Sequence, residues 1–396
     1  MGEVIAQLKS SLTKGDIWEG TDIPPRYVKN TIGEHREIKA VVQPADKEEI
    51  KRIIKTSLKM RWHIYPTSTG KNWGYGSALP VTEKNIILDL SRLNSIRNYD
   101  PELGIVTVEP GVTQQLLYEF LQANGDHHMV PTTGAGPQAS ILGNTLERGY
   151  GMTPETNHYE SLQDIEVILA DGSTITTGFD NFKAHNLKGV FKHPPGMALM
   201  GIFTQSSLGI VVSITLRLAK KSTHSGFFTF QAKEAELSSA VKVVREIRQN
   251  YHGLVGGINL MCPKRMEAVT GQAQDSWTIL GGIYGSRDIT AAICKEIRQT
   301  TKENKFTKVN CLENRSLRFL LRLKKWLGWL RILPEFQAKI QQSVSIYKIL
   351  NGQPSQMALS LAYKSIHKSV NLEKERLDPA QDGCGLLWFA PLIPLK

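Results

Sequence analysis

HIYPTSTGKNWGYG, residues 63–76, decides how the rest of the chain can be interpreted. A short apolar strand runs directly into a polar, glycine-rich loop. Glycines let the backbone approach a ligand closely, and consecutive N–H groups form a concave anion site. Four side chains of the loop add donors suited to a diphosphate, namely Ser68, Thr69, Lys71 and Asn72. The stretch therefore predicts a phosphate-binding loop, with a long polar turn as the alternative.

A second glycine-rich region, residues 134–151, reads GAGPQASILGNTLERGYG. A loop this long inside a compact domain is usually functional or disordered. Ile141, Leu142 and Leu146 make it too apolar for disorder. Neither region has the GxxxxGK(S/T) pattern of a Walker loop, or a GxGxxG at a strand-to-helix turn. Two such loops predict a single long, phosphate-bearing cofactor laid between them.

Short apolar strands alternate with helices on both sides of these loops. Asp46 is a helix N-cap, and Glu49 three residues later predicts a capping box. Thr113 begins a second helix, and Gly125 ends it. The expected strands are 40–42, 63–66, 85–90, 105–108, 164–169, 173–177 and 210–218, the expected helices are 47–59 and 113–124, and residues 131–158 are expected to be irregular.

The segment KKSTHSG at residues 220–226 is the clearest domain boundary. Beyond it we expect strands at 227–230, 257–261 and 278–284 and helices at 235–250 and 288–304. That order predicts an α+β unit with an antiparallel sheet. The expected division is an N-terminal segment at 1–32, a first domain at 33–221 and a second domain at 222–396.

Composition excludes several classes of protein. The 396 residues are 41% hydrophobic and 21% charged, which indicates a packed protein rather than a disordered one. No run approaches the ~18 apolar residues of a membrane span, and the first residues have no apolar signal core. Four widely spaced cysteines without a CxxC pair, and His127-His128 without further ligands nearby, predict neither a disulfide framework nor a metal site. We therefore expect a cytoplasmic protein.

The net charge of +11, from 48 basic and 37 acidic residues, is the one unusual feature of the composition. Residues 315–331, RSLRFLLRLKKWLGWLR, hold six basic side chains and two tryptophans but no acid. The favoured interpretation is a domain helix with its apolar stripe packed inward. The alternative is a peripheral membrane-surface helix, since basic, tryptophan-rich helices suit headgroup interfaces. No nucleic-acid partner is expected, because no recognisable module accompanies the charge.

Five short blocks occur in the order found in one family of flavoproteins. They are STGKNWGYG at 68–76, EPGVT at 109–113, GNTLERGYGMTP at 143–154, FTQSSLGIV at 203–211 and WFAP at 388–391. The first resembles the family's diphosphate loop, the third its GNxxxRGxGYTP block, and the last a cap-domain signature. The chain thus resembles the vanillyl-alcohol oxidase / p-cresol methylhydroxylase (PCMH-type) flavoproteins over roughly residues 35–395.

The resemblance implies a PCMH-type FAD-binding domain at 33–221 and a substrate, or cap, domain after it. FAD would lie extended, with its diphosphate on the first loop and its flavin ring toward the domain interface. The implied cofactor-binding residues are Pro66, Thr67, Ser68, Thr69, Gly70, Lys71, Asn72, Pro110, Gly111, Ser140, Gly143, Asn144, Glu147, Gly149, Gly209 and Ile210. Tyr75, which matches a tyrosine that helps hold a phenolate oxygen, and His158 are the catalytic candidates.

The departures from the family pattern carry information too. Residues 131–139, PTTGAGPQA, contain no acid where phenol-oxidising members have one beside the flavin. Family members write the segment at 151–158 as GYTPYGDH, and here Met152 and Asn157 replace its first tyrosine and its aspartate. Leu386 and Asn72 stand where covalently linked members carry a flavin-linking histidine, so we expect non-covalent FAD. The chain ends just after WFAP, so we expect a truncated cap.

The implied activity is hydride transfer from a small alcohol, phenolic or hydroxy-acid-like substrate to flavin N5. Oxygen, a cytochrome or a quinone stays open as the electron acceptor, and a homodimer stays open as the assembly. The alternative function is a catalytically impaired or truncated relative that keeps the FAD-domain fold.

Overall fold

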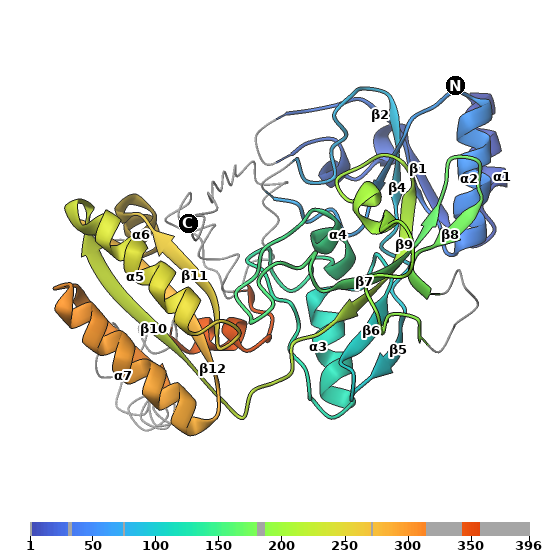
Figure 1. Cartoon of the computed structure of the whole chain (residues 1–396). Helices are drawn as coiled ribbons and strands as arrows, with labels where there is room; N and C mark the ends of the chain where they lie inside the picture. The colour runs from blue at the N-terminus through green and yellow to red at the C-terminus, as the bar shows by residue number, and fades with distance from the viewer. Residues whose placement is uncertain are drawn as a thin grey trace, which may run out of the picture.

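The computed structural model describes residues 2–30, 34–73, 76–179, 187–270, 272–313 and 343–356. Within them the chain forms three sheets (Figure 1). Two lie in the half that carries both glycine-rich regions, and one lies in the half beyond residue 222. The α+β class expected from the sequence is confirmed. The expected boundary segment, residues 220–226, covers the end of the connection that follows β9 (Ile210–Arg217) and the first three residues of β10 (His224–Lys233).

The first sheet carries the first glycine-rich loop at one end. Its order is β1 (Asp16–Glu19), β2 (Ile38–Gln43), β4 (Asn85–Asp89) and β3 (Ile64–Thr67). The last three strands are parallel, and β1 is antiparallel to β2. Parallel strands need a crossover connection, and α2 (Lys47–Lys59) provides it between β2 and β3. Ile50 and Ile53 of α2 are fully buried, together with Leu8 of α1 (Gly2–Ser10). The N-terminal segment is therefore built into this sheet and its core.

Glu49 does only half of what the expected capping box requires. Asp46 accepts a hydrogen bond from the Glu49 N–H at 2.9 Å, as expected. The Glu49 carboxylate does not return to the Asp46 N–H; it accepts instead from the backbone N–H groups of Thr13, Lys14 and Ala45, each at 2.7 Å. The reciprocal half of the box was wrong because the incoming N-terminal chain offers the carboxylate more donors.

The second sheet is antiparallel throughout. Its order is β5 (Ile96–Asp100), β6 (Ile105–Val108), β9, β7 (Leu162–Ile168) and β8 (Thr174–Thr176). The expected helix is α3 (Gln114–Ala123), whose N-cap Thr113 accepts from the Leu116 N–H at 3.1 Å. Leu117 and Leu121 of α3 are buried in the core of this sheet.

In the half of the chain that carries both glycine-rich regions, the sequence prediction missed one helix and two strands. The stretch expected to be irregular contains α4 (Ile141–Leu146), and β1 and β5 also lie where no strand was expected. The six residues of α4 include a glycine and an asparagine, which have low helix propensity. Burial of Ile141 and Leu142 in the core, together with the N-cap Ser140, outweighs that propensity. This short helix lies at the centre of the candidate site.

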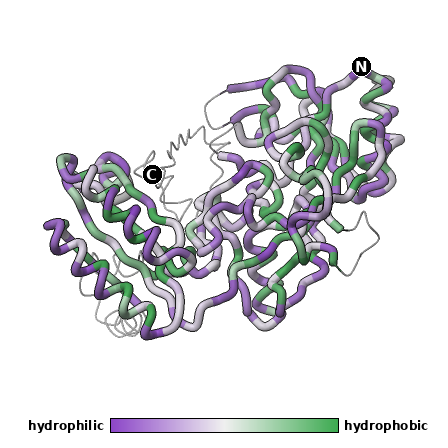
Figure 2. Tube along the Cα trace, in the orientation of Figure 1, coloured by the Kyte–Doolittle hydropathy of each residue, from purple (hydrophilic) through white to green (hydrophobic). Residues whose placement is uncertain are grey.

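The third sheet has the order β11 (Val255–Met261), β12 (Ser276–Gly285), β10 and β13 (Thr307–Glu313) and is antiparallel. Helices α5 (Leu237–Asn250) and α7 (Arg287–Glu303) cover one face, and α6 (Pro263–Thr270), which was not expected, follows β11 (Figure 1). Phe228 and Phe230 pack with these helices, whereas Phe227 packs on the opposite side. This is the alternation that a strand imposes on successive side chains. Figure 2 shows hydrophobic and hydrophilic stretches alternating along α5 and α7.

A helical segment at 343–350 joins the third sheet to the first half of the chain. The Tyr284 hydroxyl of β12 donates to the Leu350 carbonyl at 2.6 Å. From the other side, the Thr132 hydroxyl donates to the Ile349 carbonyl at 2.7 Å. The basic segment at 315–331 and the WFAP block at 388–391 lie outside the described residues. No helix among the described residues is long and apolar enough to cross a membrane.

Candidate cofactor site

The first glycine-rich loop begins at the carboxyl end of β3, within the parallel part of the first sheet. Gly70 has a φ of +67°, a conformation that side chains rarely adopt, so glycine suits this turn. The Ser77 N–H donates to the Asn72 carbonyl at 2.9 Å, and the Trp73 indole donates to the Ala135 carbonyl at 3.0 Å. The second contact brings the two glycine-rich regions together.

Three hydroxyl groups of this loop are buried without a partner. Thr67 Oγ1, Thr69 Oγ1 and Ser77 Oγ make no hydrogen bond within the described structure. Leaving a buried hydroxyl unpaired costs about 1–3 kcal/mol, and native proteins seldom do so without a reason. A loop that keeps three such groups is suited to a ligand that supplies acceptor atoms.

Helix α4 lies directly against the loop. The Ser140 hydroxyl donates to the Pro110 carbonyl at 2.7 Å and accepts from the Gly143 N–H at 3.0 Å. A Cβ at Gly143 would lie 2.5 Å from Ser68 Oγ, so only glycine fits there without a shift. Four of the predicted cofactor residues therefore meet at one point.

Gly111, Gly209 and Ile210 lie where the two sheets of the first half approach each other. A Cβ at Gly111 would stand 2.0 Å from the Ser91 carbonyl oxygen. Gly209 precedes β9, and Ile210 pairs with Ile168 of β7. Ile210 belongs to the core that includes Leu88 of the first sheet. These three residues thus lie at the junction of the two sheets.

His158 is buried and follows the third family block by four residues. Its Nδ1 lies 2.5 Å from Asn144 Oδ1, and its Nε2 has no partner among the described residues. A Cβ at Gly149 would collide with the Asn144 side chain at 2.2 Å, and one at Gly151 would lie 2.3 Å from His158 Nε2. Burial lowers the pKa of His158 to about 4, so the ring is neutral at pH 7. These residues form a tightly packed turn around a neutral imidazole.

Glu147 and Arg148 follow α4. Burial raises the pKa of Glu147, and burial followed by the nearby Glu147 raises the pKa of Tyr65. The Arg148 guanidinium donates to the Thr204 hydroxyl at 3.3 Å and lies over the Tyr159 ring. Glu147 thus lies close to Tyr65 of β3, whereas Arg148 contacts the connections on either side, at Thr204 and at Tyr159 just before β7.

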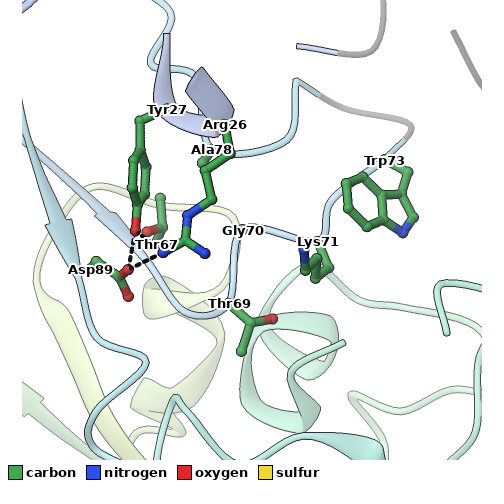
Figure 3. A pocket seen from close by; sticks show the side chains of 9 residues that line it. All are labelled: Arg26, Tyr27, Thr67, Thr69, Gly70, Lys71, Trp73, Ala78 and Asp89. Carbon is green, nitrogen blue, oxygen red and sulfur yellow. Dashed lines mark hydrogen bonds and ion pairs between the residues drawn. The ribbon is translucent and has the colours of Figure 1, made fainter. Parts of the chain in front are cut away.

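Sequence reasoning missed a group of residues that shares a cavity with the loop. Figure 3 shows the cavity, lined by Arg26, Tyr27, Thr67, Thr69, Gly70, Lys71, Trp73, Ala78 and Asp89. Asp89 ends the fully buried strand β4, and a carboxylate in that position was the available signal. Arg26 and Tyr27 come from the 3₁₀ turn η2 (Pro25–Tyr27), and nothing in sequence spacing places that turn here. The other catalytic candidate, Tyr75, lies outside the described residues.

The residues present fit FAD. Unpaired buried hydroxyls, a glycine turn, and Arg26 and Lys71 offer donors and positive charge to a diphosphate. Gly143 lets α4 pack closely against Ser68 of the loop, and Gly149 lets the chain after α4 pack closely against Asn144.

Comparison with known proteins places these loops in a family. A family model described as an FAD binding domain matches residues 38–178. The chain is 29% identical over 388 residues to 1'-carboxy-chondrochloren decarboxylase of Chondromyces crocatus, covering 91% of this chain and 70% of that protein. It is 34% identical over 212 residues to the 4-cresol dehydrogenase (hydroxylating) flavoprotein subunit of Pseudomonas putida, covering 53% of this chain and 41% of that protein.

Two solved structures share the fold. A substrate-bound p-cresol methylhydroxylase superposes with a TM-score of 0.76 at 22% identity, covering 91% of this chain and 71% of that one. The 4-ethylphenol oxidase of Gulosibacter chungangensis gives 0.78 at 19% identity, covering 92% and 72%. The matched FAD-binding model contains both glycine-rich regions, and the fold likeness extends to the third sheet. The chain therefore carries an FAD binding domain at residues 38–178 and shares the fold of p-cresol methylhydroxylase and 4-ethylphenol oxidase.

Proposed function

We propose that this protein is an FAD-dependent oxidoreductase that oxidises a small phenolic, alcohol or hydroxy-acid-like substrate. When bound, FAD supplies the chemistry, because the flavin takes a hydride at N5 and passes the electrons to oxygen or another acceptor. The observation that carries the proposal is the loop with three unpaired buried hydroxyls inside the segment matched as an FAD binding domain.

The residues proposed to hold the cofactor keep the positions given above. The loop at 66–72 would bind the diphosphate through its backbone N–H groups and hydroxyls. Ser140 and Gly143 would set the distance between that loop and α4, and Asn144 would face the cofactor. The neutral His158 holds Asn144 in place, so we assign it a positioning role rather than proton transfer. Tyr75 is assigned contact with a phenolate oxygen on the family resemblance.

The junction with the third sheet supports an aromatic substrate. The Tyr150 hydroxyl lies 3.2 Å from Asn259 Oδ1, and Asn259 Nδ2 lies 3.0 Å from Met152 Sδ. Burial raises the pKa of Tyr150 to about 12, so the phenol remains a donor at neutral pH. Phe227 and Leu280 form the apolar side of the same junction. An apolar body with one polar end matches p-cresol and 4-ethylphenol, after which two of the similar structures are named.

The test begins with the purified protein and FAD. We expect a bound yellow flavin that is released into the supernatant on acid precipitation, because the binding is proposed to be non-covalent. A panel of 4-alkylphenols, benzylic alcohols and 2-hydroxy acids is then added without oxygen. Bleaching of the flavin band by a phenol would support the proposal, and absence of any bound flavin would overturn it.

The alternative is a relative that binds FAD but does not turn over. It is favoured by one observation, the absence of an acid in PTTGAGPQA at residues 131–139. Such a protein would bind flavin yet show no bleaching with any substrate in the anaerobic panel. The acceptor, a homodimer, a cytoplasmic location and peripheral membrane contact through 315–331 remain predictions.

A further inference from the structure

The cavity beside the diphosphate loop includes a cation from the N-terminal segment. Turn η2 carries Arg26 to the carboxyl ends of the parallel strands, where Thr67 ends β3 and Asp89 ends β4. In Figure 3 the Arg26 guanidinium lies between Asp89 and the loop at Gly70. Arg26 precedes the segment matched by the family model, which begins at residue 38.

The Arg26 guanidinium is only partly used by the protein. Among the described residues it makes one hydrogen bond, to the Tyr27 hydroxyl at 2.7 Å, and one ion pair, with Asp89 at 3.7 Å. The second distance is too long for a hydrogen bond. A guanidinium has five N–H donors, and 45% of this side chain is exposed. Most of its donors therefore have no partner among the described residues, and the side chain lines the cavity.

Asp89 fixes the position of this cation but does not saturate it. The carboxylate is 3% exposed and accepts hydrogen bonds from the Tyr27 hydroxyl, the Ser91 N–H at 2.8 Å and the Gln43 amide at 3.3 Å. Tyr27 in turn packs its ring against Arg26 at 4.7 Å. Donors from turn η2, from strand β2 and from the residues just after β4 hold the carboxylate, so the guanidinium is oriented before any ligand binds.

Several polar side chains in the remaining cavity wall can donate hydrogen bonds. Thr67 is 9% exposed and Thr69 Oγ1 is buried, and both hydroxyls lack partners. Lys71 adds a second cation to the same lining. The one acid in the lining, Asp89, already accepts from three groups. Such a surface suits an oxyanion, and a planar guanidinium binds two oxygens of a phosphate at once.

We propose that Arg26 is a phosphate ligand of the cofactor site, so that the N-terminal segment at 2–30 completes the FAD-binding domain. This inference rests on the proposed function, because it takes the diphosphate of FAD as the oxyanion. Tyr27 and Asp89 are positioning residues that act through Arg26.

The experiment measures the Kd for FAD, by quenching of flavin fluorescence, at two salt concentrations for wild type, Arg26→Gln, Arg26→Lys and Arg36→Gln. Arg36 is the matched control, because it lies in the same part of the chain and bonds only to Glu34, Val81 and His35. We expect Arg26→Gln to raise the Kd about tenfold and to flatten its salt dependence. Arg26→Lys should raise it a few-fold, and Arg36→Gln should leave it unchanged.

A competition with ADP, which carries the diphosphate without the flavin, locates the effect. Arg26→Gln should raise the Kd for ADP by the same factor as the Kd for FAD. Equal FAD affinities for wild type and Arg26→Gln, or a loss for FAD without a loss for ADP, would overturn this inference alone. If Arg26→Gln does not fold, an unchanged Kd and salt slope in Arg26→Lys has the same meaning. Failure of wild type to bind FAD at all would instead overturn the proposed function.

Discussion

Two regions of the first half of the chain place several hydrogen-bond donors around a buried position. In the first, the protein itself supplies the anion that accepts these bonds, and in the second it does not. At the first, the Glu49 carboxylate is fully buried and accepts from the N–H groups of Thr13, Lys14, Gly15 and Ala45 and from the Thr13 hydroxyl. At the second, the loop at 67–77 keeps three buried hydroxyls with no acceptor among the described residues. One site is closed by the chain itself, and the other is complete only with a ligand.

The difference teaches which region contributes to stability and which to binding. Burial alone would raise the pKa of Glu49, but hydrogen bonds from Ala45, Lys14 and Thr13 outweigh it and lower the pKa to about 2. Removing the anion from the first site should therefore destabilise the folded protein, whereas removing a donor from the second should leave its stability unchanged.

The largest expected effect comes from Glu49→Gln. The change deprives several buried donors of a charged acceptor, so we expect a loss of about 3 kcal/mol in the free energy of unfolding. Chemical denaturation of the apo protein measures it. Glu48→Gln, whose side chain is exposed beside Lys51, is the matched control and should cost less than about 0.5 kcal/mol. Equal losses in the two variants would contradict the claim that the buried Glu49 carboxylate stabilises the fold.

The free energy of unfolding should fall in two separate pH ranges, one for each of two buried groups. Glu49 and His158 both have pKa values that folding lowers, from 4.5 to about 2 and from 6.5 to about 4. In each case the stabilisation is fully present above the unfolded pKa and is lost as pH falls through the folded one. Stability should fall between pH 6.5 and 4 because of His158, and again between pH 4.5 and 2 because of Glu49. Each range is worth up to about 3 kcal/mol.

Single substitutions show which residue causes the loss of stability in each pH range. His158→Asn should remove the upper decline and leave the lower one, and Glu49→Gln should do the reverse. Denaturation midpoints at pH 7, 5.5, 4 and 3 provide the comparison. A decline between pH 6.5 and 4 that persists unchanged in His158→Asn would contradict burial of a neutral imidazole.

A smaller effect is expected at the ligand site. Thr67→Val and Thr69→Val each remove an unpaired buried hydroxyl while keeping the side-chain shape. The apo protein should be as stable as wild type, or more stable by up to about 1 kcal/mol. The Kd for FAD should rise about fivefold for each, since a net hydrogen bond is worth about 1 kcal/mol. Thermal unfolding and flavin titration together test the prediction, and Thr13→Val, which loses a bond to Glu49, serves as the contrasting control.

The smallest effect is expected where the loop meets α4. Gly143→Ala places a Cβ 2.5 Å from Ser68 Oγ, which must rotate or shift. A hydroxyl moves easily, so the Kd for FAD should rise only two- to threefold, roughly 0.5 kcal/mol. In Ser68→Ala/Gly143→Ala the clash is removed, and the double variant should not be worse than Ser68→Ala alone. A clearly additive loss in flavin titrations would contradict this contact.

The sequence predicted what depends on local pattern. Glycines and hydroxyls marked both loops, and period-two and period-3.6 patterns marked most strands and helices. It could not predict which donors reach Glu49, because Thr13 and Lys14 lie more than thirty residues away and arrive through β1. Arg26 and Asp89 escaped for the same reason, since a turn and a strand end meet only once the sheet has formed. Helix α4 was missed because burial, not propensity, makes it a helix.

The most direct test of this account compares the double variant Thr67→Val/Thr69→Val with wild type in parallel FAD titration and apo thermal unfolding. The account predicts a Kd raised by about twentyfold or more, with an unfolding temperature equal to or above that of wild type. An unchanged Kd, or a fall in unfolding temperature comparable with that of Glu49→Gln, would contradict the claim that this loop is built to be completed by the cofactor.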